Sequence, residues 1–303
     1  MSNNMKGSIM LLITAAIWGS AFVAQSLGVG VVGPFTFSAV RALMALAVLI
    51  PVIYFFSAQS RRRKHAPFLL RILPDRWTVF GGIWCGIALT IAEGLQQIGL
   101  LWTGAGKAGF ITSLYIIIVP LMGILLGRKI RSLVWLCVII AAAGFYFLCI
   151  KEDFTAEAGD IFILASTLFY SVHIYVIDHF LMHNADAIKM SWVQFGAQAA
   201  GASVIALIFE TPQLSPVMEA FPSIAYAGVL SSGVAFTLQN LGQKYMDDAS
   251  VATLLMSLES VFAVLTGWAV LGEVLTPREI FGCVLVFAAV LLAQKPQKIE
   301  IGQ

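Results

Sequence analysis

Long apolar runs, separated by short polar connections, fill most of the 303-residue chain. A helix needs roughly 20 apolar residues to cross the hydrocarbon core of a bilayer, so the pattern predicts an all-α membrane protein with ten transmembrane helices. The first run follows a single Lys6, as in a signal peptide, but nine more runs come after it, so we expect a retained helix. The predicted segments are Gly7–Leu27, Pro34–Phe56, Trp77–Leu101, Gly104–Leu126, Leu133–Ile150, Asp160–Leu181, Met190–Phe209, Ser223–Leu241, Ala249–Leu271 and Ile280–Gln294.

Composition supports a membrane environment. Hydrophobic residues make up 59% of the chain and charged residues only 11%, whereas a soluble domain carries about 25% charged residues. We therefore expect an integral protein of the bacterial cytoplasmic (inner) membrane. The basic cluster Arg61–Lys64 suits anionic lipid headgroups, and we expect no nucleic-acid partner because no segment has the character of a soluble domain.

The charges also predict the orientation. Of the 18 lysines and arginines, most fall in connections on one side of the predicted bundle. The connections on the other side hold only Lys107, Lys151 and Arg278. Cytoplasmic connections are enriched in Lys and Arg, so both termini are predicted to be cytoplasmic.

An internal repeat divides the chain. Gly7–Leu12 aligns with Gly159–Leu164, and Gly81–Gln96 aligns with Gly228–Gln243. Five segments precede the second copy, so it enters the membrane upside down, as in secondary transporters whose substrate site lies between the two halves. We expect a first five-helix repeat over residues 1–150 and a second, inverted one over 151–303. Pro51 and Pro120 can kink their helices, but no two matching segments are interrupted by Gly or Pro.

Polar residues follow one face of the third segment. Gly86, Thr90, Glu93 and Gln97 are spaced by four, three and four residues, which places them on one side of a helix. A carboxylate is poorly suited to face lipid and well suited to face a water-filled cavity. Their repeat partners are Gly233, Thr237, Asn240 and Lys244, and Trp18 of the first segment similarly matches Tyr170 of the sixth. The pairs predict two walls of one chamber.

Several motifs are spread over nearly the whole chain: Trp18–Val23, Pro34, Arg41, Gly106–Ile111, Tyr115, Pro120, Ser257–Phe262 and Leu271–Glu273. In these motifs the chain resembles the drug/metabolite transporter superfamily, specifically its EamA-like ten-helix permeases. Departures are Ser260, where family members often have Pro, and Arg128, where they often have Glu. The resemblance implies two inverted five-helix repeats that move small metabolites by alternating access, often as exporters of amino acids or related compounds, and it transfers no particular substrate.

Each candidate residue has a functional and a structural interpretation. Glu93 could recognise a substrate amine or couple transport to protons, or it could hydrogen-bond a neighbouring helix. Glu259 could be a second cavity acid or could cap a backbone gap near Ser260. Arg41 could neutralise a cavity acid, bind an anionic substrate or anchor two helices. Lys107 could gate the outer mouth, contact the substrate there or be merely solvated.

Aromatic, histidine and amide side chains complete the candidate set. Trp18, Tyr115 and Tyr170 could hold an apolar or cationic group, although packing is the commoner role of such residues. The predicted substrate-binding residues are Trp18, Thr90, Glu93, Gln97, Tyr115, Tyr170, His173, Asn240 and Glu259. The predicted gating or coupling residues are Arg41, Lys107 and Glu93.

The preferred function is secondary transport of a small amino acid-like or amphiphilic metabolite, as efflux, with possible proton coupling and with no cofactor or metal ion. A sugar or nucleotide-sugar carrier of the same superfamily, a channel and an intramembrane enzyme are the alternatives. The chain has no Walker-type loop for ATP, and its four histidines (His65, His173, His179 and His183) are scattered. We expect a monomer or a homodimer.

Overall fold

The computed structural model describes residues 3–28, 30–59, 72–149, 157–246, 248–271 and 276–294, and within these ranges the elements are all helices. The all-α prediction is therefore confirmed. The elements are α1 (Asn3–Gly28), α2 (Pro34–Gln59), α4 (Arg76–Gly99), α5 (Ala105–Ser113), α6 (Tyr115–Leu125), α7 (Ser132–Cys149), α8 (Ala158–Met182), α9 (Ala187–Phe209), α10 (Leu214–Glu219), α11 (Phe221–Ala225), the π-helix η1 (Tyr226–Phe236), α12 (Thr237–Lys244), α13 (Ala249–Met256), α14 (Glu259–Leu271) and α15 (Pro277–Ala293).

Eight helical stretches of the described residues are long and apolar enough to cross a membrane, and Ser132–Leu148 is a shorter apolar helix. Large apolar side chains such as Leu125, Ile161 and Phe209 point outward along these helices, which is the arrangement that lipid requires. Ten crossings and cytoplasmic termini stay predictions. The basic cluster Arg61–Lys64 and the predicted repeat boundary at residues 150 and 151 lie outside the described residues.

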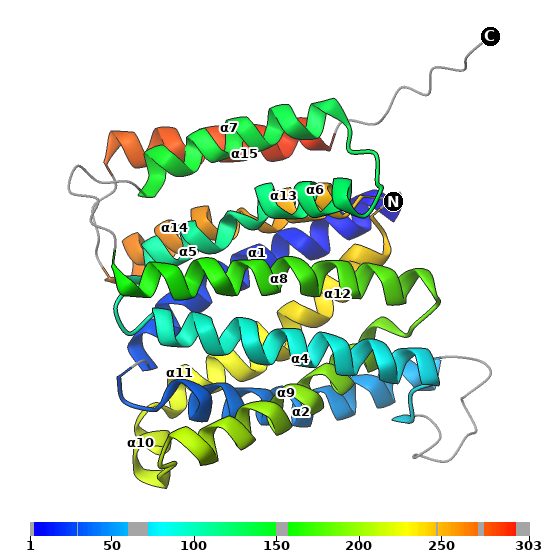
Figure 1. Cartoon of the computed structure of the whole chain (residues 1–303), viewed down its shortest axis with the longest axis vertical. Coiled ribbons are helices and arrows are strands. Elements are labelled where there is room, and N and C mark those ends of the chain that lie inside the picture. The colour runs from blue at the N-terminus through cyan, green and yellow to red at the C-terminus, as the bar shows by residue number, and fades with distance from the viewer. Residues whose placement is uncertain are drawn as a thin grey trace.

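The helices pack side by side in a bundle, with α7 and α15 together at one end of its long axis and α2 and α9 near the other (Figure 1). The packed pairs are related by the repeat. α4 packs against α8 and α9, and its repeat partner, η1 with α12, packs against α1 and α2. In the same way α1 packs against α13 and α14 while α8 packs against α5 and α6. Helices of the two repeats therefore pack against each other throughout the middle of the bundle.

Polar caps fix where several helices begin. Asp75 accepts hydrogen bonds from the backbone N–H and the hydroxyl of Thr78 at the start of α4, and Thr78 Oγ1 accepts from the backbone N–H of Asp186 at the start of α9. Burial alone would raise the pKa of Asp75. The hydrogen bonds that its carboxylate accepts, from Thr78 among others, outweigh burial, so the pKa of Asp75 is below its ordinary value. These hydrogen bonds fix the start of α4 beside the start of α9, and so they fix how the later residues of the two helices lie relative to each other.

Two predicted segments are broken at corresponding places. α5 and α6 are separated at Leu114, and α13 and α14 at Ser257 and Leu258. The absence of matching Gly or Pro interruptions gave no sign of this pair of breaks, because hydroxyl groups accompany them instead. The Ser113 and Ser260 hydroxyls contact each other, and Ser260 Oγ also donates to Gly109 O. Such side chains supply partners for backbone groups that a broken helix releases inside a membrane.

The predicted segment Ser223–Leu241 also differs from a single α-helix, because it is divided into α11, η1 and α12. In a π-helix the carbonyl pairs with an N–H five residues on, so the turn is wider than in an α-helix, and π-turns often occur at functional sites. Thr14 Oγ1 of α1 donates to Ala235 O in this stretch. The short helix α10 was not predicted.

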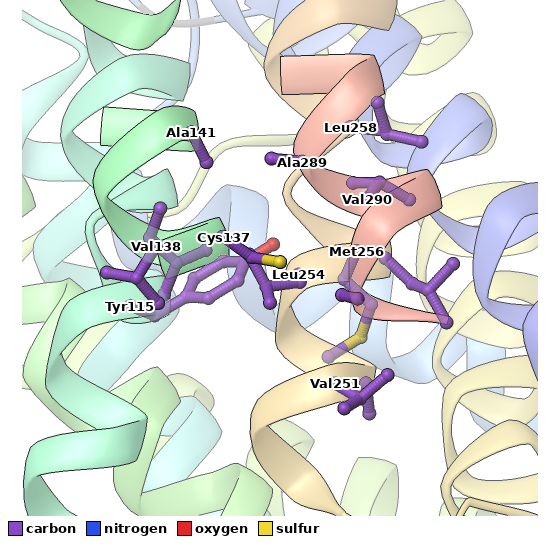
Figure 2. Close-up of a cluster of buried hydrophobic side chains, with 14 of the residues drawn as sticks. Tyr115, Cys137, Val138, Ala141, Val251, Leu254, Met256, Leu258, Ala289 and Val290 are labelled. Atoms are coloured by element: carbon purple, nitrogen blue, oxygen red, sulfur yellow. The ribbon is translucent and has the colours of Figure 1, made fainter. Parts of the chain in front are cut away.

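An apolar cluster fills one half of the bundle's centre. Figure 2 shows part of it, with Tyr115 and Cys137 facing Leu254 and Met256 across the gap between helices. The cluster runs along α7 as far as Leu148, and its residues from the first half of α1 and from α6 and α13 lie toward the end where α1, α4 and α9 begin (Figure 1). That end is the one predicted to be cytoplasmic.

Candidate functional site

A cavity lies beside this apolar cluster, between the two repeats. Protein atoms leave about 510 Å³ unfilled here, a volume that includes open solvent at the mouth of the cavity. Helices of both repeats contribute its lining residues, which are Trp18, Phe22, Gln25, Arg41, Glu93, Gln96, Thr112, Tyr115, Tyr170, His173, Ile174, Ser231, Phe236, Gln239, Met256 and Glu259.

A buried ion pair forms one side of the cavity. Arg41 Nη2 of α2 lies 3.4 Å from Glu93 Oε1 of α4, and the two side chains are 2% and 1% exposed. The remaining Glu93 oxygen, Oε2, accepts a hydrogen bond of 2.6 Å from Gln198 Nε2 on α9. Three helices of both repeats are therefore joined at Glu93.

The Arg41 guanidinium is surrounded by acceptors. Nη1 donates to Gln25 Oε1 at 2.9 Å, Nε donates to Ser232 Oγ at 3.0 Å and Nη2 donates to Ser231 Oγ at 3.2 Å. Ser231 and Ser232 are consecutive residues of η1, and both reach the same guanidinium. A buried charge is tolerated when it is paired and hydrogen-bonded, and here each of the three guanidinium nitrogens has a partner.

Glu259 is the second acid of the cavity and has no such shell. It is 3% exposed, and no described lysine, arginine or histidine forms an ion pair with it; its Oε1 has no hydrogen-bond partner among the described residues. It begins α14, where the helix dipole stabilises a negative charge by about 0.3–1 kcal/mol. A carboxylate at membrane depth costs at least about 2.5–3.5 kcal/mol, so the dipole alone does not offset its burial.

Aromatic rings form another part of the lining, the aromatic wall. The Trp18 and Phe236 ring centroids are 4.8 Å apart, and Trp18 Nε1 donates to Ser231 O at 3.3 Å. His173 stands edge-on to Phe236, and its Nε2 lies 3.3 Å from Gln194 Oε1. Tyr170 Oη donates to Gln96 Oε1 at 3.2 Å. These rings leave an apolar surface with polar atoms at its edges.

Most predicted site residues come together at this cavity. Its lining includes the predicted residues Trp18, Arg41, Glu93, Tyr115, Tyr170, His173 and Glu259. The structure places the other predicted residues elsewhere. Lys107 forms ion pairs with Asp160 (2.7 Å) and Glu157 (3.7 Å) at the start of α8.

Thr90, Gln97 and Asn240 do not line the cavity. Thr90 Oγ1 donates to Gly86 O within its own helix, and Gln97 Nε2 donates to Gln25 Oε1. Asn240 Nδ2 donates to Ser191 Oγ at 2.8 Å. The polar face that begins at Gly86 therefore mainly packs against α9, because a glycine and a threonine let the two helices approach closely.

Sequence reasoning did not place the remaining lining residues in the substrate-binding set. Gln25 lies two turns after Trp18 on the same helical face, and Gln96 and Gln239 are polar residues within apolar segments, so these positions carried a signal. The others are apolar or hydroxyl residues whose role depends on neighbours distant in sequence. The residues outside the predicted set are Phe22, Gln25, Gln96, Thr112, Ile174, Ser231, Phe236, Gln239 and Met256.

A helical bundle with membrane-length helices and a cavity between its two repeats is an architecture suited to membrane transport. The chain belongs to the EamA-like transporter family, whose sequence model matches residues 5–150 and 157–294. The family covers both repeats, which confirms the resemblance seen in the sequence. Among the described residues no group of three or more His, Cys, Asp or Glu side chains is placed to hold a metal ion.

Two relatives carry names of the same kind. An uncharacterized transporter of Archaeoglobus fulgidus is 30% identical over 285 residues, which cover 93% of this chain and 83% of the relative. The uncharacterized transporter YoaV of Bacillus subtilis is 22% identical over 293 residues, which cover 93% of this chain and 94% of the relative. These names point to transporters rather than enzymes.

The fold also occurs in solved structures. One crystal structure superposes with a TM-score of 0.72 over 95% of this chain and 96% of that chain, at 19% sequence identity. At this identity the likeness concerns the fold alone.

Proposed function

We propose that this membrane transporter is a secondary carrier that exports a small amino acid-like or amphiphilic metabolite by alternating access. The observation that supports it best is the cavity between the repeats, which combines an aromatic wall with two buried acids. We place the chain in the cytoplasmic membrane with both termini inside. The two repeats would rock against each other around the cavity.

The position of the cavity supports an outward-facing state. Gln25 lies near the end of α1 and Arg41 near the start of α2, so the lining reaches toward the connection between these helices. The α1, α6 and α13 residues of the apolar cluster fill the half predicted to be cytoplasmic. In the alternate state the cluster would part and the outer end would close.

Two polar contacts between the repeats lie at the predicted outer end and would have to change in that transition. Glu210, after α9, accepts hydrogen bonds from the backbone N–H groups of Phe35 and Thr36 at the start of α2. Lys107, before the break in the fourth segment, pairs with Asp160 of α8. The second contact supports a gating role for Lys107.

Proton coupling is part of the proposal, and the Arg41–Glu93 ion pair indicates which of the two acids binds the proton. Glu93 already has Arg41 as its counter-ion. Glu259 has none among the described residues, so a proton can offset its buried charge. We therefore place the proton on Glu259 and give Glu93 the task of holding Arg41.

Transport assays in proteoliposomes test both parts. A counterflow screen over amines, amino acids and sugars should find a substrate that the purified chain exchanges. With that substrate at a saturating concentration, Glu259→Gln should abolish accumulation driven by a pH gradient and spare exchange. If Glu93→Gln has this effect instead, Glu93 is the coupling acid. Absence of saturable counterflow for every compound would refute the carrier function.

A further inference from the structure

We infer that the cavity selects primary amines that lack a carboxylate over the corresponding amino acids. The inference rests on the proposed transport function and concerns the chemistry of the same site. It follows from the charges of the cavity and from its unpaired polar atoms, taken together.

The charges of the lining leave one negative group without a partner. Arg41 and Glu93 neutralise each other as an ion pair. Glu259 adds a carboxylate, and no described cationic side chain pairs with it. An ammonium group entering the cavity would supply the missing counter-ion.

The carboxylate of an amino acid would meet the opposite situation. Arg41 is the one arginine or lysine in the lining, and its Nε, Nη1 and Nη2 already donate to Ser232, Gln25 and Ser231. A substrate carboxylate would have to displace Glu93 or enter without a cation. Both are unfavourable, because a buried charge that loses its partner is left uncompensated.

The unpaired polar atoms of the lining point the same way. Glu259 Oε1 and Gln239 Oε1 are buried without a hydrogen-bond partner among the described residues. Both oxygens can accept a hydrogen bond, and a primary ammonium carries three N–H donors. The Tyr115 hydroxyl lies beside the Glu259 carboxyl and can donate to it.

The aromatic wall fits the rest of such a substrate. Trp18, Phe236 and Tyr170 offer ring faces and apolar edges beside the acid. Aromatic faces attract organic cations and also pack against apolar chains. An amine with an aryl or alkyl group therefore matches both walls at once.

Three probes with the same ring separate the charge types: phenethylamine is a cation, phenylalanine a zwitterion and 3-phenylpropionate an anion. Binding to the purified full-length chain in detergent is measured by isothermal titration calorimetry. We expect phenethylamine to bind at least about tenfold more tightly than phenylalanine, since a charge-assisted hydrogen bond commonly contributes that factor. 3-Phenylpropionate should bind most weakly.

Variants assign the preference to Glu259. Glu259→Gln should weaken phenethylamine binding at least about tenfold and remove its advantage over phenylalanine. Glu219→Gln, which changes an exposed acid of α10, should bind all three probes as the unmodified chain does. If Glu259→Gln unfolds, Glu259→Asp should retain the order of the probe affinities. The three affinities for the unmodified chain then test the preference for amines.

The inference is overturned if phenethylamine does not bind, if phenylalanine or 3-phenylpropionate binds equally well, or if Glu259→Gln keeps the preference. Counterflow in proteoliposomes separates this result from the transport function. Selective amine binding without counterflow would refute the carrier and leave the amine site. Counterflow of phenylalanine without phenethylamine would retain the carrier and refute the amine site.

Discussion

The third helical segment of each repeat has the same sequence pattern and a different structure. In both copies a threonine hydroxyl donates to the carbonyl four residues earlier, from Thr90 to Gly86 O at 2.8 Å and from Thr237 to Gly233 O at 2.7 Å. α4 is a regular α-helix, whereas its partner contains the π-helix η1. The shared pattern therefore fixes local hydrogen bonds but not the shape of the helix.

The chemistry of the two copies differs as well. Glu93 of α4 meets Arg41 at the cavity, and its repeat partner Asn240 turns to Ser191 of α9. The second copy instead contributes Ser231 and Ser232, which bind the Arg41 guanidinium from η1. One copy thus supplies the counter-ion of Arg41 and the other its neutral acceptors. A symmetric scaffold holds an asymmetric site.

The largest expected effect comes from removing the cation that both copies share. Arg41→Met leaves Glu93 as an unpaired buried carboxylate, which should lower the free energy of unfolding by about 3–5 kcal/mol. The fall is measured as a lower thermal unfolding midpoint in detergent. The double variant Arg41→Met/Glu93→Gln should recover much of the loss, because it removes both charges. A double variant no more stable than Arg41→Met would show that the ion pair is not the cause.

Substitution of the matching glycines, Gly86 and Gly233, should change the free energy of unfolding by a smaller amount, and by different amounts in the two copies. A methyl group on Gly86 would lie 2.5 Å from Gln194 O and Ala197 Cβ of α9, whereas the nearest atom to one on Gly233 is Gly228 O at 3.4 Å. Gly86→Ala should therefore destabilise the protein by about 1–3 kcal/mol through overpacking.

Gly233→Ala is the matched control and should lie within about 1 kcal/mol of the unmodified chain, since alanine favours helices and meets little steric resistance there. Both are compared by thermal unfolding in the same detergent. Equal losses would mean that the two copies pack alike.

Much of this fold follows from the sequence, because each predicted apolar segment is helical over most of its length. A long apolar run inside a bilayer must satisfy its backbone hydrogen bonds within the segment, so it forms a helix. The breaks at Leu114 and Ser257 could not be predicted in this way. They coincide with contacts between hydroxyls of different repeats, such as Ser113 with Ser260, and such contacts exist only after folding.

The site shows the same division. Glu93 and Glu259 could be identified because a carboxylate is conspicuous in an apolar helix. The face shared by Thr90 and Glu93 was expected to line the cavity. Different residues of that face contact different neighbours, however, and α9 covers Thr90. Ser231 and Ser232 gave no signal, because serine is common in membrane helices and their role depends on the π-turn and on Arg41.

The smallest expected effect concerns the hydroxyls that the two copies have in common. Thr90→Val and Thr237→Val remove a bond to the residue's own helix, and such bonds to the fourth residue back stabilise helices little or even bend them. Each change should alter the free energy of unfolding by no more than about 0.5 kcal/mol, the usual range for substitutions that create no cavity or unpaired charge. Since Thr90 lies outside the cavity lining, Thr90→Val should also leave phenethylamine affinity unchanged in calorimetry. A marked loss of affinity in Thr90→Val alone would return this residue to the site and would extend the asymmetry of the two copies to their common threonine.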